Sequence, residues 1–227
     1  MDGAQLAAYV LHSRRYRDSS LLVDFLSREE GRIVCVARGA LRPKSNLPVR
    51  QPFQPLVIEY RGRGEVSTLV RAEATAPPTT LSGRQLYCGL YLNELMLRLT
   101  ARQDPHPHLF DDYAMTLAAL QEGVDTERVL RRFEVKLLDG IGLGLLLKDD
   151  SQGQPVCADA EYTYNVELGP VRASDADRQT YGGATLLAMR SGDWVGEKAL
   201  AEARRLMRSV LDHHLEGRPL RTRELFR

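Results

Sequence analysis

The chain has 227 residues, of which 43% are hydrophobic and 27% are charged, and its formal net charge is +1. These values are typical of an ordinary soluble globular protein, and no internal repeat or low-complexity segment is present. No apolar run approaches the roughly 20 residues of a membrane helix, and the start of the chain does not resemble a signal peptide. Three widely separated cysteines support neither a disulfide framework nor a zinc site. We therefore expect a cytoplasmic protein from a reducing compartment, without a membrane-bound part.

Five short strands are predicted in the first 75 residues. Apolar and β-branched residues favour strands over residues 8–11, 21–26, 32–38, 56–61 and 65–70. The glycines of Gly62-Arg63-Gly64 indicate a hairpin between the last two strands. A closed barrel accounts for this pattern, because closure removes the exposed edges of short antiparallel strands. An OB-fold barrel fits the strand count, and an SH3-like barrel fits nearly as well.

Three helices are predicted after Pro77-Pro78. The first begins at Ser82, with Gln85 as its capping-box partner, and its wide apolar surface indicates burial against several neighbours. The second covers residues 109–121. The third covers residues 126–139, because apolar side chains recur there at helical spacing.

The remaining third of the chain mixes a hairpin with helices. Glycines at 140, 142 and 144 follow a helix, so they indicate helix termination and not a dinucleotide-binding loop. A hairpin near residues 162–166, helices at 185–190 and 197–215, and a flexible basic tail at 218–223 come next. The predicted fold is α+β. An N-terminal OB-fold barrel (1–80) and a central helical domain (81–145) precede a C-terminal region (146–227), whose hairpin and helices pack on the helical domain.

A basic stretch stands out within the strand-rich segment. Between Gly31 and Ile58 there is no aspartate or glutamate, and the cations there are Arg32, Arg38, Arg42, Lys44 and Arg50. Such charge suits a polyanion, because each neutralised phosphate releases condensed counterions. A solvated basic loop is the alternative interpretation.

Catalytic motifs are not found in the sequence. Neither a GxSxG elbow nor a P-loop occurs. His106-Pro107-His108 has no nearby cysteine or glutamate to complete a metal site. Asp111-Asp112 and Asp149-Asp150 are sequence neighbours, which on a helix point about 100° apart and so do not imply a shared site. We expect a binding protein that is not an enzyme and needs no metal or cofactor.

Several strings along nearly the whole chain match, in order, those of one family. The most specific are Val36-Ala37-Arg38-Gly39-Ala40, Tyr91-Leu92-Asn93-Glu94-Leu95, Leu130-Arg131-Arg132-Phe133-Glu134 and Arg221-Thr222-Arg223-Glu224-Leu225-Phe226. With these strings the chain resembles the RecO family of bacterial recombinational-repair mediators.

The resemblance implies an OB fold, a helical domain and a small C-terminal region. It also implies binding of single- and double-stranded DNA, annealing of complementary strands, and a nucleoid-associated location. The implied protein partners are the acidic C-terminal tail of single-strand-binding protein and RecR, with which the family loads recombinase. Many relatives carry a four-cysteine zinc module in the C-terminal region. This chain has only Cys157 there, so it resembles the zinc-free branch.

The predicted DNA-binding residues are mostly arginines of the barrel. They are Arg14, Arg15, Tyr16, Arg17, Arg32, Arg38, Arg42 and Lys44. The cations would neutralise phosphates without reading bases. Tyr16, within a polar run, is the aromatic residue that we expect to be exposed for base stacking. At least half of the barrel aromatics should instead fill its interior.

A second cationic feature lies on the helix at 126–139. Arg128, Arg132 and Lys136 recur at i, i+4 and i+8, with Arg131 adjacent. Cations beside an apolar groove suit an acidic peptide that ends in an apolar residue. By resemblance, Arg131 and Arg132 are candidates for docking the tail of single-strand-binding protein. The alternative for Arg131 is a local ion pair with Glu127.

Two other functions stay open at this stage. An adaptor could use the barrel mainly for protein–protein contacts, although an acid-free basic stretch argues against this. An RNA-binding OB protein cannot be distinguished by charge, because RNA and DNA share the phosphate backbone.

Overall fold

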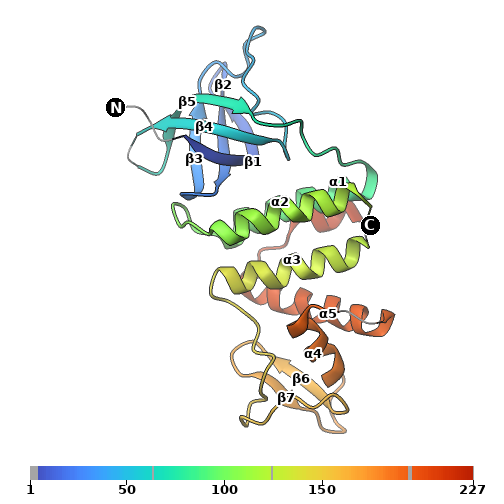
Figure 1. The fold of residues 1–227 in the computed structure, drawn as a ribbon. Helices are drawn as coiled ribbons and strands as arrows, with labels where there is room; N and C mark the ends of the chain where they lie inside the picture. The colour runs from blue at the N-terminus through green and yellow to red at the C-terminus, as the bar shows by residue number, and fades with distance from the viewer. Residues whose placement is uncertain (1–4, 63, 124, 194–195, 227) are drawn as a thin grey trace. The chain divides into compact units, whose positions relative to one another are not determined.

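The computed structural model describes residues 5–62, 64–123, 125–193 and 196–226. A strand barrel, helices and a small sheet follow one another along the chain, which confirms the predicted α+β class (Figure 1). The described residues form two compact units. One comprises Met1–Val124 and Leu220–Arg227, and the other comprises Asp125–Pro219. The boundaries predicted near residues 80 and 145 stay a prediction.

The N-terminal barrel has the arrangement of an OB fold. Its strands are β1 (Leu6–Tyr16), β2 (Ser20–Ser27), β3 (Gly31–Ala37), β4 (Pro55–Arg61) and β5 (Ser67–Ala74). They close in the order β1-β2-β3-β5-β4, with β1 pairing to β4 and a parallel pair between β3 and β5. The five predicted strands are confirmed, and this order selects the OB fold over the SH3-like alternative. Arg63 of the predicted Gly62-Arg63-Gly64 hairpin lies outside the described residues.

The barrel interior is filled by alternate side chains of all five strands. The cluster includes Val10, Val23, Phe25, Cys35 and Ile58, each at most 2% exposed. Alternation of this kind is what a strand with one buried face requires. The side chain of Phe25 is therefore part of the packed core and not a stacking platform.

Two helices follow the barrel within the same unit (Figure 1). They are α1 (Gly83–Leu99) and α2 (Pro107–Gln121). Ser82 is the N-cap residue of α1, but its side chain makes no capping hydrogen bond. The predicted capping box is therefore wrong, and the first turn depends on backbone bonds such as Gln85 N–H to the carbonyl of Ser82.

Aromatic and charged contacts join the barrel to these helices. The ring of Tyr9 in β1 lies 5.3 Å from that of Phe110 and 5.2 Å from that of Tyr113, both in α2. Arg28, after β2, donates two hydrogen bonds of 3.1 and 2.9 Å to Asp111. Gly31, the first residue of β3, lets the backbone of Asp104 approach closely. A Cβ at position 31 would lie 2.0 Å from the carbonyl oxygen of Asp104.

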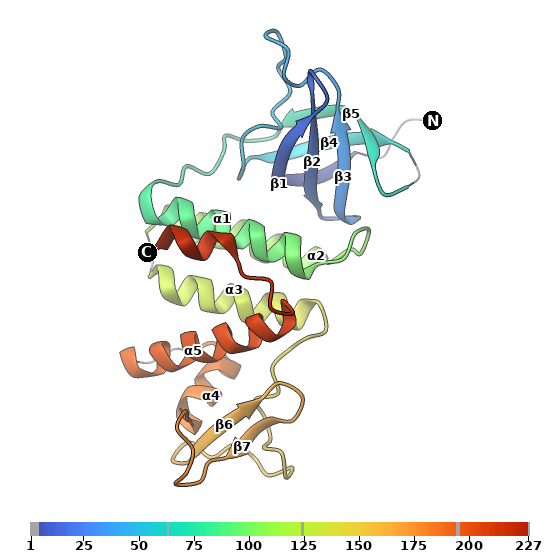
Figure 2. The same ribbon diagram turned by 180° about the vertical axis from the view of Figure 1, so that it is seen from behind.

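The C-terminal segment returns to α1. Leu220 is 2% exposed, and the short 3-10 helix η1 (Arg221–Phe226) runs beside α1 (Figure 2). Glu94 accepts hydrogen bonds from the amides of Arg221 and Thr222, at 3.0 and 2.8 Å, and from the Thr222 hydroxyl at 2.7 Å. The predicted flexible tail is therefore wrong, because its backbone is bound by a carboxylate 127 residues earlier.

The second unit contains three helices and a three-stranded sheet. The helices are α3 (Thr126–Gly140), α4 (Gly183–Ser191) and α5 (Glu197–His214), and the sheet order is β7 (Gly169–Arg172), β6 (Glu161–Asn165), β8 (Tyr181–Gly182). Asp125 caps α3 by accepting a bond from the amide of Arg128. The predicted hairpin is confirmed by β6 and β7, and the glycines after 139 end α3 as expected.

We predict that Glu94 controls the docking of η1 in a pH-dependent way. Burial alone would raise the pKa of Glu94, but hydrogen bonds from Thr222 and Arg221 and the charge of Arg98 hold it below its ordinary value of 4.5. The contact therefore contributes fully above that value and is lost as the pH falls through the lowered folded pKa. Glu94→Ala should lower the free energy of unfolding by about 1–3 kcal/mol at neutral pH.

Hydrogen exchange at the amides of Arg221 and Thr222 measures this contact directly. Exchange should be faster in Glu94→Ala at neutral pH, and in the parent the protection factors of these amides, relative to intrinsic exchange at the same pH, should fall as the pH drops below 4.5. Glu224→Ala removes an exposed carboxylate from the same segment and is the matched control. Equal protection of both amides in all three proteins would contradict the assignment.

Candidate nucleic-acid interface

Three predicted cations lie at the end of β1 and in the turn that follows it. Arg14, Arg15 and Arg17 are exposed. Arg17 adopts a left-handed backbone conformation with φ of 54°, which lets the chain reverse within three residues between β1 and β2. Its guanidinium carbon lies 5.3 Å from the centre of the Tyr16 ring, and Tyr16 itself is half-buried.

The connection after β3 carries the other exposed cations. Gly39 has φ of 69°, which glycine adopts without strain, and a turn follows in which the Arg42 amide bonds the Gly39 carbonyl at 3.0 Å. The guanidinium of Arg50 donates to the carbonyl of Ala40 and so holds the two ends of this connection together. Arg38, Arg42 and Lys44 remain exposed.

These two segments meet at one end of the barrel. The strand register aligns Arg15 with Leu21 and Leu21 with Ala37, directly before Arg38. The Leu41 amide donates a 2.9 Å bond to the carbonyl of Ser19 in the β1–β2 turn. Arg50 is exposed as well, but its guanidinium is bound to the Ala40 carbonyl. We call the other six exposed cations of the two segments the basic rim: Arg14, Arg15, Arg17, Arg38, Arg42 and Lys44.

The basic rim differs in its ion pairing from Arg28 and Arg71 of the same unit. Arg28 pairs with Asp111 at 2.9 Å, and Arg71 pairs with Glu73 at 2.7 Å. Within the described part of the chain, none of the six rim cations has a carboxylate within ion-pairing distance. An incoming phosphate therefore need not displace an internal partner.

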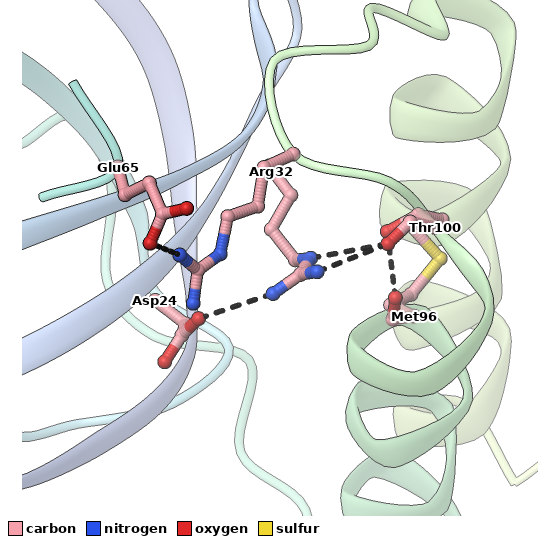
Figure 3. Close-up of polar contacts among 6 residues, drawn as sticks. Asp24, Arg32, Glu65, Met96 and Thr100 are labelled. Atoms are coloured by element: carbon pink, nitrogen blue, oxygen red, sulfur yellow. Dashed lines mark hydrogen bonds and ion pairs between the residues drawn. The ribbon is translucent and has the colours of Figure 1, made fainter. Parts of the chain in front are cut away.

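Arg32 lies elsewhere, although the sequence placed it with the DNA-binding cations. Its Nη1 donates to Asp24 at 3.3 Å, while Nε and Nη2 donate to the carbonyl of Thr100 at 3.3 and 3.1 Å (Figure 3). Its side chain is 14% exposed, and burial lowers the pKa of the guanidinium despite the neighbouring Asp24. Arg32 thus joins β3 to the end of α1.

The same junction covers part of the face that OB folds usually present to oligonucleotides, along strands 2 and 3. Leu22, Leu26 and Val34 lie on β2 and β3 outside the barrel-interior cluster, yet they are only 7%, 3% and 3% exposed. These three side chains are therefore buried within the unit and are not accessible to a ligand. The six cations of the basic rim, in contrast, are exposed.

The barrel aromatics mostly make structural contacts, but the prediction that at least half of them fill the interior is wrong, because among the described residues only Phe25 belongs to the interior cluster and Tyr60 packs against it. Tyr9, Phe25 and Phe53 are buried, and the hydroxyl of Tyr60 bonds Glu30. Burial, the hydrogen bond and the charge of Glu30 raise the pKa of Tyr60 well above its usual range. Tyr16 is the aromatic residue that lies beside the basic rim.

The four predicted tail-binding residues of α3 do not share one environment. Arg128, Arg132 and Lys136 are exposed, and Arg128 pairs with Asp125 at 3.1 Å. Arg132 donates a long bond of 3.4 Å to the carbonyl of Gly192. Arg131 is 8% exposed and pairs with Glu134, which is fully buried.

The alternative pairing predicted for Arg131 is not the one found. Glu127 lies 3.6 Å from Arg204 of α5. The guanidinium of Arg131 pairs instead with Glu134, three residues later.

Neither a metal centre nor a membrane span is found in the part of the chain that the structure describes. Three potential metal ligands of the His, Cys, Asp or Glu type do not gather anywhere within it. Its helices are too short or too polar to cross a membrane.

Family models and relatives agree with the fold. Residues 1–78 match the model described as Recombination protein O N terminal, and residues 81–224 match Recombination protein O C terminal. The chain belongs to the RecO family. The DNA repair protein RecO of Aromatoleum aromaticum is 46% identical over 228 residues, covering 98% of this chain and 95% of the relative. The protein of the same name from Halorhodospira halophila is 44% identical over 232 residues, covering 100% and 98%.

The structural role of Arg50 in the candidate interface was not predicted from the sequence. This arginine belongs to the acid-free stretch, but the sequence could not show that its guanidinium binds the Ala40 carbonyl. The signal was its position next to Val49, a buried residue that anchors the connection in the barrel core.

We predict opposite effects for two arginines of the basic stretch. Arg32→Ala should lower the free energy of unfolding by about 1–3 kcal/mol, because the Thr100 carbonyl and Asp24 lose their donor. It should leave the slope of log K against log salt for single-stranded DNA unchanged. Arg38→Ala, the matched control, should reduce that slope by roughly 0.7 with little loss of stability. Thermal unfolding and fluorescence anisotropy measure the two quantities. A reduced slope in folded Arg32→Ala would return Arg32 to the DNA surface.

Proposed function

We propose that this RecO-family protein is a DNA-binding, strand-annealing mediator of recombinational repair. It acts on DNA coated by single-strand-binding protein and, with RecR, helps to load recombinase. The observation that carries the DNA-binding part is the basic rim: six exposed cations at the end of β1, in the turn after it and in the adjoining connection after β3, without carboxylate partners among the described residues.

The chemistry of the rim suits a backbone contact. Loop arginines and a lysine can follow phosphates of either a single strand or a duplex, since both carry the same anion. A set of six phosphate contacts would give a slope of log K against log salt of roughly −4 for a single strand. Tyr16 adds one ring for stacking with any base.

Annealing requires no covalent step. Two complementary strands repel each other through their phosphates, so a surface that neutralises these charges lowers the barrier to their encounter. Cations that contact only the backbone leave the base edges free to pair. This mechanism needs neither a cofactor nor a catalytic residue.

The protein partners enter the proposal through the family and through α3. Exposed Arg128, Arg132 and Lys136 offer an acidic peptide three cations on one helix, and this arrangement favours the tail of single-strand-binding protein as their ligand. Arg131 is committed to Glu134 in this arrangement, so its contribution is to the fold of α3. RecR is proposed on family membership.

The DNA-binding part is tested with a triple variant. Arg38→Ala, Arg42→Ala and Lys44→Ala together should weaken single-stranded DNA binding and reduce the salt slope by about 2, since three phosphate contacts are lost. The same variant should slow annealing of complementary strands precoated with single-strand-binding protein. Anisotropy titrations at several salt concentrations and a fluorescence annealing assay give the two readouts.

The matched control removes three exposed cations from elsewhere. Arg84, Arg190 and Arg208 are exposed, and their joint replacement by alanine changes the net charge equally. Equal losses of slope in the two triple variants would show that overall charge, and not the basic rim, binds DNA. Competition with an RNA of matched sequence separates a DNA-binding from an RNA-binding protein.

The tail contact is tested at two neighbouring arginines. Arg132→Ala should weaken binding of a peptide with the acidic tail sequence of single-strand-binding protein, because one exposed cation of the stripe is lost. Arg131→Ala should mainly lower thermal stability, because it leaves the buried Glu134 without this partner. Peptide titration and thermal unfolding distinguish these effects. Unchanged peptide affinity in Arg132→Ala would remove the α3 stripe from the tail site.

A further inference from the structure

Strand β1 contains an irregularity just before the residues of the basic rim. Val10 pairs with Phe25 of β2, but the next aligned pair is His12 with Asp24, so Leu11 is an extra residue in β1. An extra residue of this kind is a β-bulge. Bulges re-aim the side chains that follow them, because a shift by one residue exchanges the two faces of a strand.

The bulge sets the face of β1 on which the residues after it lie. Arg14 and Arg15 are both exposed, but Arg14 alone of the two lies on the face opposite the core residues. Before the bulge, Leu6, Ala8 and Val10 point into the barrel core. After it, Ser13 and Arg15 are aligned with the core residues Val23 and Leu21. Arg14 is aligned with Leu22, which lies outside the core cluster. Without the extra residue, the alternation would direct positions 14 and 16 toward the interior.

Two buried polar residues hold this bulge in place. Nδ2 of Asn93 in α1 donates a 2.9 Å bond to the carbonyl oxygen of Leu11, the extra residue. Oδ1 of Asn93 accepts a 2.6 Å bond from the hydroxyl of Tyr113 in α2. Asn93 is 3% exposed and Tyr113 is fully buried. A buried amide is costly unless its groups are bonded, so this pair specifies one position for the Leu11 carbonyl.

We propose that Asn93, oriented by Tyr113, is a positioning residue for the DNA-binding surface. It fixes the β1 bulge and thereby places Arg14, a residue of the basic rim, on the outer face of β1 together with the half-buried Tyr16. The consequence for DNA rests on the proposed function, whereas the consequence for side-chain direction does not. The two are therefore tested separately.

Side-chain direction is measured by thiol reactivity. Cys35 and Cys88 are 0% exposed, so a Cys157→Ser background leaves no exposed native thiol among the described residues. Arg14→Cys and Ser13→Cys then report on the outward and inward positions. In the parent background the thiol at 14 should react faster with a maleimide than the thiol at 13. Asn93→Leu, which keeps the side-chain size but removes the amide, should decrease that ratio.

A milder variant and a control keep this measurement decisive. Tyr113→Phe removes only the hydroxyl that orients Asn93, and it should decrease the ratio less, even where Asn93→Leu fails to fold. Asp111→Ala breaks the ion pair with Arg28, another contact of the barrel with α2, without touching the bulge. It should leave the ratio unchanged. Unchanged ratios in Asn93→Leu and Tyr113→Phe, or an equal decrease in Asp111→Ala, would overturn the proposal.

The DNA consequence is measured as coupling between Asn93 and Arg14. Arg14→Ala should reduce the salt slope for single-stranded DNA by roughly 0.7 in the parent, and by much less in Asn93→Leu or Tyr113→Phe, where Arg14 is already misdirected. Lys44→Ala should reduce the slope equally in all backgrounds. A purely structural role would leave the effect of Arg14→Ala equal as well, and that result would overturn the positioning role. Should Arg14→Ala have no effect in the parent, the DNA-binding role of the rim fails, and the thiol ratios still decide whether Asn93 sets the bulge.

Discussion

The hydrogen bonds from Arg32 to the Thr100 carbonyl join the barrel to α1, and the position of α1 determines which barrel surface stays exposed. Thr100 is the C-cap residue of α1, where terminal carbonyls carry partial negative charge and need donors. A guanidinium supplies two such donors and keeps a third for Asp24 of β2. The barrel is thereby fastened to α1 through the face that other OB folds use for ligands. The proposed DNA contact therefore uses the basic rim at the barrel end and not this face.

Much of this architecture follows from the sequence. The β-branched runs, the turn glycines and the spacing of apolar residues were sufficient for the five strands and three central helices. The closing order of the barrel was not predictable, because it depends on which strands pair and not on any one strand. The docked C-terminal segment was not predictable either. Its anchor, Glu94, lies 127 residues before Arg221, and nothing local marks that carboxylate as a partner for backbone amides.

The candidate site was predicted less completely, for the same reason. Arg32 and Arg38 look alike in the sequence, because both lie in the stretch without acidic residues. The carboxylate that pairs with Arg32 lies outside this stretch. Asp24 lies on the adjoining strand, and burial makes this pair structural. For Arg131, too, the sequence did not identify the carboxylate with which it pairs. Glu127 and Glu134 are both within helical reach of it, and only the buried side of α3 decides between them.

Pairing and burial thus sort the arginines into different roles. A paired arginine must release its carboxylate before it can bind phosphate, and this exchange leaves a carboxylate to be solvated again. The rim cations have no such partner among the described residues, so the proposed phosphate contacts would not require this exchange. Tyr16 is subject to one further constraint. Because Arg17 lies 5.3 Å from the centre of its ring, a base that stacks on the same face has to displace that cation. Stacking at this position would therefore compete with a cation–π contact, so the proposed DNA binding by the rim depends mainly on phosphates.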